Sequence, residues 1–342
     1  MITPLTHTEP PTVSRRQFLQ ACLVGGGLAA SGFSLLHWFS GPRLSAQTFI
    51  GQAENYEADF AILIRQGLKE LGVTPSEING KRILLKPNLV EPHKSFSHIN
   101  THPLVVRGAV DAFLHLGAAS VVVAEGPGHR HDTLFVLEES GLADVLYEDR
   151  IPFQDLNSVE GVTRPNLGGH TKLTTLTFPL VVQEVDWVVS VAKMKTHHWA
   201  GATLSMKNFF GVMPGNYYGW PKNVLHQAGI PQSILDINAT LKPHFAIVDA
   251  VIGMEGDGPI MGNPVQAGVL VMGRNLPSVD ATCCRIMGID PHKIEYLRKA
   301  DQWLGPIHES LIEQRGESWR TVQHPFALVP EIPAHQGIRL SL

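Results

Sequence analysis

Short, continuous apolar runs that end abruptly in polar residues constrain the fold of this chain most. In the clearest case Val188, Val189 and Val191 are followed at once by Lys193 and Lys195. The length and β-branched composition of this run are typical of a strand buried on both faces of a parallel sheet. Ligands of open α/β sheets bind outside the carboxyl ends of the strands. We therefore expect segment 186–215 to form the centre of a binding site.

Similar apolar runs recur along the chain and alternate with helical patterns. Strands are expected at 82–85, 120–124, 245–248 and 267–272, and helices at 58–71, 104–116, 132–148, 230–241 and 281–287. A strand, a helix and a second strand in this order predict a parallel sheet with a right-handed crossover. The expected fold class is therefore α/β, a mostly parallel central sheet flanked by helices, with a small β-rich insertion within 151–180.

Composition limits the class of protein and its partners. The chain has 342 residues, of which 44% are hydrophobic and 17% charged, so it can bury a large core. Its net charge is −4 and no run of Lys or Arg stands out. No nucleic acid is expected as a partner, and no polybasic segment is present to bind a membrane surface.

The N-terminal sequence resembles a twin-arginine secretion signal. Arg15 and Arg16 precede Phe18 and Leu19, and a stretch rich in Gly, Ala and apolar residues then runs to residue 39. The resemblance implies the twin-arginine translocation machinery as a partner and a periplasmic location after export in the folded state. Cleavage is expected after Ala46. The alternative is an uncleaved segment that anchors the protein to the inner membrane. In either case the membrane is contacted only through this segment.

The remaining domain boundaries follow from the same patterns. Residues 1–46 are assigned to the signal, 47–80 to an N-terminal helical lead-in, 81–290 to the α/β domain, and 291–342 to a C-terminal covering helix and tail.

The predicted strands are followed by charged residues from distant parts of the chain. Several lysines in one crevice favour an anionic ligand, a carboxylate or a phosphate, and confinement lowers the pKa of a lysine toward values at which it exchanges protons. The candidate catalytic residues are Lys195, His197, Lys207 and Glu255. The candidate ligand-binding residues are Lys86, Asn88, His102, Glu125, Lys193, Asn208, Lys222 and His226. Asp249, Glu255 and His197 are a candidate ligand set for a divalent metal ion.

The cysteines point away from thiol chemistry. The chain has three, and Cys283 and Cys284 are adjacent, a spacing typical of buried helix residues and unsuited to a mutual disulfide. No Cys-x-x-Cys motif occurs, so no iron–sulfur cluster is expected from this chain.

Several ordered motifs resemble family 362 of the domains of unknown function. They are Lys86-Pro87-Asn88, Thr101-His102-Pro103, Lys193–His197, Lys207-Asn208 with Gly211, and Met254–Pro259 with Gly262 and Asp280. The resemblance covers roughly residues 81–290. Some members of that family carry a ferredoxin-like cluster module, whose cysteines this chain lacks. More remotely, the arrangement looks similar to the catalytic domain of nickel-pincer lactate racemase, at the level of the fold alone.

Three classes of function therefore remain open. The first is an enzyme that acts on a small carboxylate or phosphorylated compound. The second is a non-catalytic protein that captures an anionic ligand or a metal ion outside the cytoplasm. The third is an accessory protein of a redox system, which only the cluster-bearing relatives imply.

Overall fold

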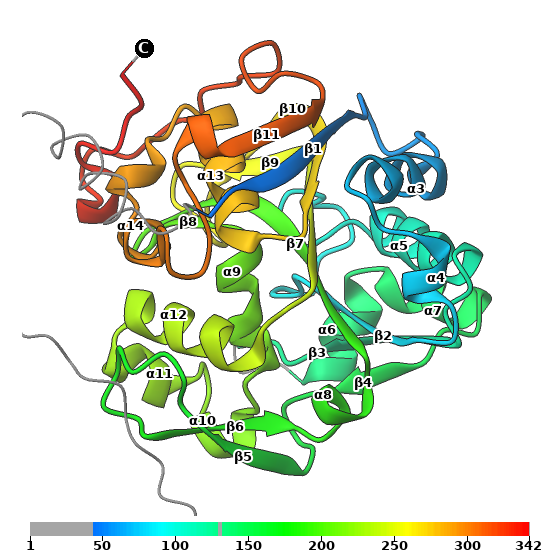
Figure 1. The fold of residues 1–342 in the computed structure, drawn as a ribbon. Helices are drawn as coiled ribbons and strands as arrows, with labels where there is room; N and C mark the ends of the chain where they lie inside the picture. Colours follow the sequence, from blue (N-terminus) through cyan, green and yellow to red (C-terminus); the bar gives the residue numbers. More distant parts are fainter. Residues whose placement is uncertain (1–43, 129–131, 342) are drawn as a thin grey trace, which may run out of the picture. The chain divides into compact units, whose positions relative to one another are not determined.

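A single sheet carries the strands in the order β11–β1–β10–β9–β7–β2–β3–β4, with β8 paired to β7 (Figure 1). The computed structural model describes residues 44–128 and 132–341. The strands of this sheet are β1 (Ala46–Gln52), β2 (Arg82–Pro87), β3 (Ser120–Glu125), β4 (Phe153–Asp155), β7 (Trp187–His197), β8 (Gly201–Thr203), β9 (Phe245–Glu255), β10 (Asn263–Gly273) and β11 (Ile312–Gly316). Strands β9, β7, β2, β3 and β4 are mutually parallel, whereas β10 pairs antiparallel with both its neighbours. The predicted mostly parallel α/β sheet is confirmed.

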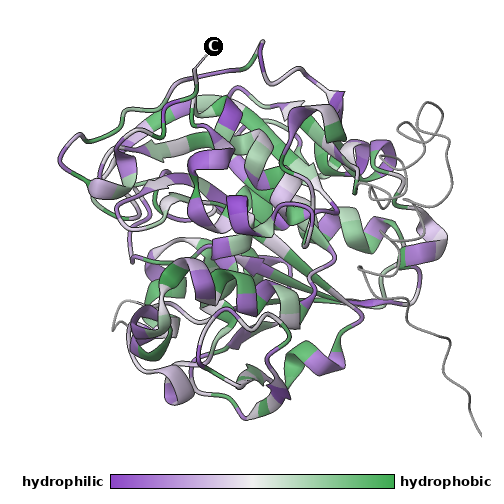
Figure 2. Cartoon of the chain, turned by 60° about the vertical axis from the view of Figure 1, so that its left-hand side comes forward, coloured by the Kyte–Doolittle hydropathy of each residue, from purple (hydrophilic) through white to green (hydrophobic). Residues whose placement is uncertain are grey.

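Each face of the sheet carries its own apolar core. In β2, Ile83 and Leu85 belong to one core and Leu84 belongs to the other, as the two-residue period of a strand requires. In Figure 2 most helices carry both hydrophobic and hydrophilic segments, as expected when one side of a helix faces a core and the other faces solvent. Parallel strands buried on both faces explain why the sequence shows continuous apolar runs and no alternation.

The helices divide between the two faces. The first face packs against α3 (Phe60–Glu70), α4 (Pro75–Ile78), α5 (Pro103–His115), α6 (Thr133–Glu139) and α7 (Leu142–Glu148). The second packs against α8 (Val181–Glu184), α9 (Ser205–Asn208), α10 (Gly215–Tyr218), α11 (Asn223–Ala228), α12 (Ile230–Leu241), α13 (Leu276–Ile286) and α14 (Glu295–Ala300). Short 3₁₀ turns lie at Phe209–Val212, Pro291–Lys293, Glu309–Leu311 and Pro333–His335.

Strands β7 and β9 are longer than the sequence predicted. Each has eleven residues, and Lys193 pairs in register with Asp249 inside the sheet. The prediction ended each strand at its first charged residue, but the two opposite charges neutralise each other between neighbouring strands. Lys193 and Asp249 are therefore interior strand residues and do not follow the strand ends.

Several other boundaries also differ from the prediction. The expected helix 132–148 is two helices, because Gly141 adopts a left-handed φ of 79° between them. The expected helical lead-in begins with strand β1, and the C-terminal tail contributes β11, which pairs parallel with β1. Helix α13 begins five residues earlier than expected, capped by the Asn275 side chain. The β-rich insertion is a hairpin of β5 (Gly161–Pro165) and β6 (Thr175–Pro179).

The predicted twin-arginine motif lies outside the described residues. In the described part of the chain, no helix is both long and apolar enough to cross a bilayer. Cys283 and Cys284 are buried in α13, as predicted.

Candidate functional site

A cavity of about 390 Å³ lies where β2, β3 and β7 end. Because these three strands are parallel neighbours, Lys86, Glu125 and His197 meet at one edge of the sheet, as the sequence predicted. The loop after β9 covers this edge: His198 N donates to Gly258 O (3.0 Å). A cavity of this size accommodates a small ligand.

Nine predicted site residues line the cavity. They are Lys86, Asn88, Glu125, Lys195, His197, Lys207, Asn208, Lys222 and His226. They come from three strands, from α9, and from the segment at the start of α11. The sequence motifs therefore assemble around one space.

The base of the cavity is an ion pair between the Lys86 ammonium and Glu125 Oε2. Both side chains are only 1% exposed. Lys86 Nζ also donates to Asn208 Oδ1 (2.9 Å), and the Asn208 amide returns a hydrogen bond to Lys86 O (2.9 Å). A Cβ on Gly211 would lie 2.7 Å from Lys86 Nζ and would overlap Glu125 Oε1, so only glycine fits beside the pair.

Lys195 is fully buried without a carboxylate partner. Its ammonium donates to Ile99 O (2.9 Å) and Pro259 O (3.1 Å). Burial, and then the charge of Lys207, holds its pKa well below the ordinary value. Lys195 thereby ties the loop after β9 to the sheet.

Lys207 stands out in the cavity because its ammonium has no hydrogen-bonding partner among residues 44–128 and 132–341. Its ammonium lies 5.2 Å from the centroid of the Phe210 ring, and no carboxylate or carbonyl of the described residues binds it. Burial, and then the charge of Lys86, lowers its pKa to about 8. At neutral pH the cavity therefore holds a half-buried cation that has no counter-charge within the described part of the chain.

Two further polar atoms of the cavity lining are buried and have no partner among the residues that the structure describes. They are Asn88 Oδ1 and Thr203 Oγ1, on side chains 9% and 3% exposed. Buried polar atoms are normally hydrogen-bonded, so a bound ligand or water is the expected partner.

Lys222 also lines the cavity, and its ammonium has two hydrogen-bonding partners. It is 2% exposed, adopts a left-handed φ of 69°, and donates to Asn157 Oδ1 and to Met213 O (2.5 Å). Burial lowers its pKa to about 7, opposed in part by the Glu125 charge.

The two predicted histidines are held in opposite tautomers. His197 Nδ1 accepts from the backbone amides of Trp199 (2.9 Å) and Ala200 (3.2 Å), so in the neutral ring the proton is on Nε2. His226 Nδ1 lies 3.0 Å from Lys222 O and must donate to it, so Nε2 carries the lone pair. Burial lowers the pKa of both rings. The cavity lining thus offers His197 Nε2–H as a hydrogen-bond donor and His226 Nε2 as an acceptor.

Lys193 and His102 do not reach the cavity lining. Lys193 Nζ donates to Asp249 Oδ2 (2.8 Å) and Tyr56 OH (2.8 Å), and both charged side chains are fully buried. His102 caps α5 and stacks on Tyr56, with centroids 3.6 Å apart. The polar groups of this cluster satisfy one another, and neither Lys193 nor His102 lines the cavity, so a ligand-binding role for them stays a prediction.

The predicted metal ligands do not converge. Glu255 Oε2 accepts from Ala327 N (2.7 Å), Asp249 is paired with Lys193, and His197 is bound to backbone amides. Among the described residues no group of three or more His, Cys, Asp or Glu is arranged to hold a metal ion. The donors of the predicted set do not fit a metal ion, and Glu255 is absent from the cavity lining.

Sequence reasoning missed the apolar and rim residues of the cavity. Trp199, Phe210 and Met261 line it, and His198 Nδ1 lies 3.5 Å from Asp257 Oδ1 at its rim. Most of them stand inside or beside the segments that carried the charged motifs. Their position beside the charged motifs could have predicted them, but the predicted site included only charged and polar residues.

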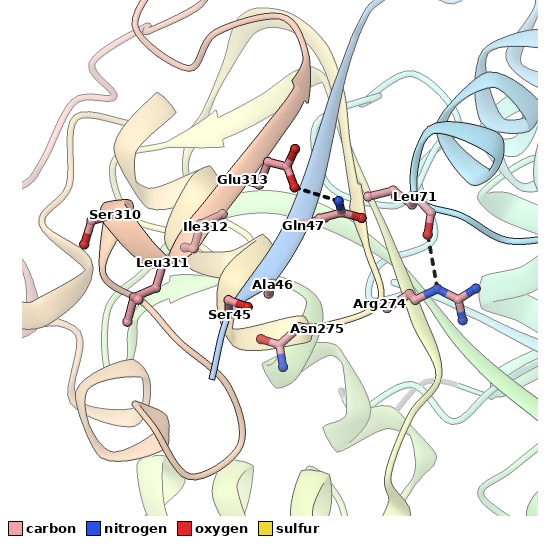
Figure 3. Close-up of a pocket in the computed structure, with 10 residues that line it drawn as sticks. All are labelled: Ser45, Ala46, Gln47, Leu71, Arg274, Asn275, Ser310, Leu311, Ile312 and Glu313. Atoms are coloured by element: carbon pink, nitrogen blue, oxygen red, sulfur yellow. Dashed lines mark hydrogen bonds between the residues drawn. The ribbon is translucent and has the colours of Figure 1, made fainter. Parts of the chain in front are cut away.

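A second, larger cavity of about 560 Å³ lies elsewhere (Figure 3). It is bordered by the start of β1, the end of β10 and the start of β11, so it opens at the amino ends of the parallel strands. Arg274 there is already bound to Glu77 (2.6 Å) and Leu71 O (3.3 Å). None of the predicted site residues lines this cavity, and the only Lys or Arg in its described lining, Arg274, is paired with Glu77.

Comparisons with known proteins identify the motif-bearing region. The profile described as Domain of unknown function (DUF362) matches residues 83–285, which is more than half of the chain. The thylakoid-associated protein sll1697 of Synechocystis sp. is 25% identical over 250 residues, 71% of this chain and 75% of that protein.

Two solved structures are more remote. The lactate racemase apoprotein from Thermoanaerobacterium thermosaccharolyticum shares 15% identity with a TM-score of 0.43, over 73% of this chain. A structural-genomics protein from Thermotoga maritima shares 12% identity with a TM-score of 0.35, over 68% of this chain. This chain covers 59% of each of those structures. Likenesses this remote leave the reaction open.

Proposed function

The chain belongs to the DUF362 family, whose name states no reaction, and we propose from its own cavity that it binds a small anion, a carboxylate or a phosphate, at the ends of β2, β3 and β7. The proposal concerns ligand class first and chemistry second.

The observation that carries the proposal is the unpartnered ammonium of Lys207. A partly buried cation without a counter-charge is costly unless an anion completes it. Lys86 offers no relief, because its charge repels that of Lys207. The free hydroxyl of Thr203 adds a neutral donor on the same lining.

The histidine tautomers support an enzyme that moves a proton on this anion. His226 Nε2 has the lone pair of a general base, and His197 Nε2–H has the proton of a general acid. The positive charge of Lys207 would hold the anion and stabilise negative charge that develops on it. A binding protein without catalysis would use the same cations and leave the histidine pair idle.

The test is calorimetric titration of the mature protein with inorganic phosphate and with acetate. Wild type should bind at least one of them, and Lys207→Met should weaken that binding at least tenfold. The matched control is Lys69→Met, which changes an exposed lysine on α3 away from the cavity. Equal affinity of Lys207→Met and wild type would refute the proposal.

Catalysis is tested separately from binding. Mass spectrometry of the small molecules that co-purify with wild type supplies candidate ligands, which are then incubated with the protein in deuterated water. Deuterium incorporation that His226→Gln abolishes would support proton transfer. Binding of an unchanged, undeuterated ligand would favour the binding protein instead.

We also propose that the chain is exported by the twin-arginine route. The support is the Arg15-Arg16 sequence and the position of β1, which begins at Ala46, so cleavage there leaves the pairs from Gln47 onward intact. The name of the cyanobacterial relative, a thylakoid-associated protein, fits a location beside a membrane. Cell fractionation of wild type and of Arg15→Lys/Arg16→Lys tests this. A periplasmic wild type and a retained variant are expected, and recovery of intact wild type in the membrane fraction would indicate the uncleaved anchor.

A further inference from the structure

We infer that the ligand is an amphipathic anion, one carboxylate or phosphate group on an apolar body, with its charged end at Lys207 and its body directed toward Trp199 and Met261. This inference rests on the proposed function and narrows its ligand class.

The first observation is the composition of the cavity wall. Between the charged groups stand apolar side chains from six segments of the chain: Leu89, Val90, Pro127, Trp199, Phe210, Pro221, Ile260 and Met261. A site for a sugar phosphate or another polyhydroxylated anion would place hydrogen-bonding side chains along the whole ligand, since each buried hydroxyl needs a partner. In this wall the apolar side chains interrupt the polar ones, so a ligand polar along its whole length would leave hydroxyls without partners.

The second observation is a gradient of exposure along the cavity. Lys195, Thr203 and His197 are 0%, 3% and 3% exposed. Trp199 and Met261 line the same cavity but are 63% and 77% exposed. The deepest cations and donors of the lining are therefore buried, whereas its most exposed apolar side chains, Trp199 and Met261, stand at the mouth.

The third observation is the way the aromatic rings connect the two ends. Phe210 contacts Lys207 on one side and the edge of His226 on the other, with ring centroids 5.7 Å apart. His226 in turn meets Trp199 edge to face at 5.7 Å. An apolar body that leaves Lys207 thus passes Phe210 and His226 before it reaches Trp199.

The exposed rings and thioether at the mouth explain what the apolar body would gain. Covering a large exposed apolar side chain with another apolar group removes both from water and lowers the free energy. The rim also carries the exposed Asp257 carboxylate, 3.5 Å from His198 Nδ1, which repels a second anionic group at this end. A single charge at the buried end fits this distribution.

The experiment is a titration series of straight-chain carboxylates, from acetate through butyrate and hexanoate to octanoate, with the matching alkyl phosphates as a second arm. Affinity should rise about fourfold for each added methylene until the chain fills the cavity. The better arm identifies the head group. Hexanol, which has the same body without the charge, should bind at least tenfold more weakly than hexanoate.

Two variants separate this inference from the proposed function. Trp199→Ser and Met261→Ser change exposed side chains and should leave acetate affinity within twofold while flattening the rise with chain length. Equal affinity for acetate and octanoate in wild type would overturn the amphipathic ligand and leave the proposed function standing. Absence of binding by every anion in both arms would overturn the proposed function itself.

Discussion

The Lys86 ammonium and the Glu125 carboxylate form an ion pair between the ends of neighbouring strands β2 and β3, with each side chain 1% exposed. Glu125 accepts two further hydrogen bonds, from Gly126 N (2.8 Å) and Leu89 N (3.2 Å). The pair therefore fixes the first residues of two loops that border the cavity.

Removing one partner of this pair should destabilise the protein strongly. Lys86→Met leaves the Glu125 carboxylate buried without its cation, which costs about 3–5 kcal/mol. The double variant Lys86→Met/Glu125→Gln removes the orphaned charge and should recover part of that loss. Urea denaturation of the three proteins measures it. Lys94→Met, which breaks an exposed pair with Asp144 (2.9 Å), is the control and should not change the unfolding free energy measurably. A double variant less stable than Lys86→Met would contradict the ion-pair account.

Lys207 should make both anion binding and stability depend on pH near 8. Its pKa in the folded chain is about 8, against an ordinary value of 10.5. Above pH 8 the folded protein loses the charge that holds the anion, so affinity should fall as the pH rises. Between about 8 and 10.5 the unfolded chain keeps the proton that the folded chain has released, so the unfolding free energy of the ligand-free protein should rise with pH in this window.

The variant Lys207→Met separates the contribution of Lys207 to the pH-dependent unfolding free energy from the contributions of the other lysines of the cavity. It should be more stable than wild type at pH 7, by about 1–3 kcal/mol, because it no longer carries an unpaired buried charge. The difference should shrink at pH 9.5. Urea denaturation at the two pH values measures both effects, and a variant that is less stable at pH 7 would show that the ammonium has a partner in solution.

The histidine tautomers can be observed directly. Long-range ¹⁵N–¹H correlation spectra should show His197 protonated on Nε2 and His226 protonated on Nδ1, because the backbone partners of Nδ1 differ. His197 should stay neutral well below pH 6.5, since burial and the charge of Lys207 oppose its protonation. Identical tautomers in the two rings would remove the basis for a paired acid and base.

The sheet and most of the cavity could be predicted from local sequence pattern. Apolar runs identified β2, β3 and β7, and parallel neighbours bring Lys86, Glu125 and His197 together. Partners supplied by unpatterned, distant segments could not be predicted. Tyr56 completes the buried Lys193–Asp249 pair from a loop before α3, and nothing in the spacing of the three residues indicates that contact.

Glu255 illustrates the same limit and gives the last prediction. The sequence placed it among the catalytic and metal-binding residues because it follows an apolar strand, but its carboxylate accepts from Ala327 N, 72 residues along the chain. Its task is to hold the C-terminal segment against the end of β9. Glu255→Gln keeps an acceptor oxygen and should leave stability and affinity for phosphate, acetate and hexanoate within twofold of wild type. Glu255→Ala should cost about 0.5–1.5 kcal/mol of unfolding free energy through the lost hydrogen bond, again with unchanged affinity. Calorimetric titration beside urea denaturation separates the two effects. If Glu255→Gln lost anion binding while its unfolding free energy stayed at the wild-type value, the carboxylate would belong to the site after all, and the cavity at the ends of β2, β3 and β7 would have to extend to β9.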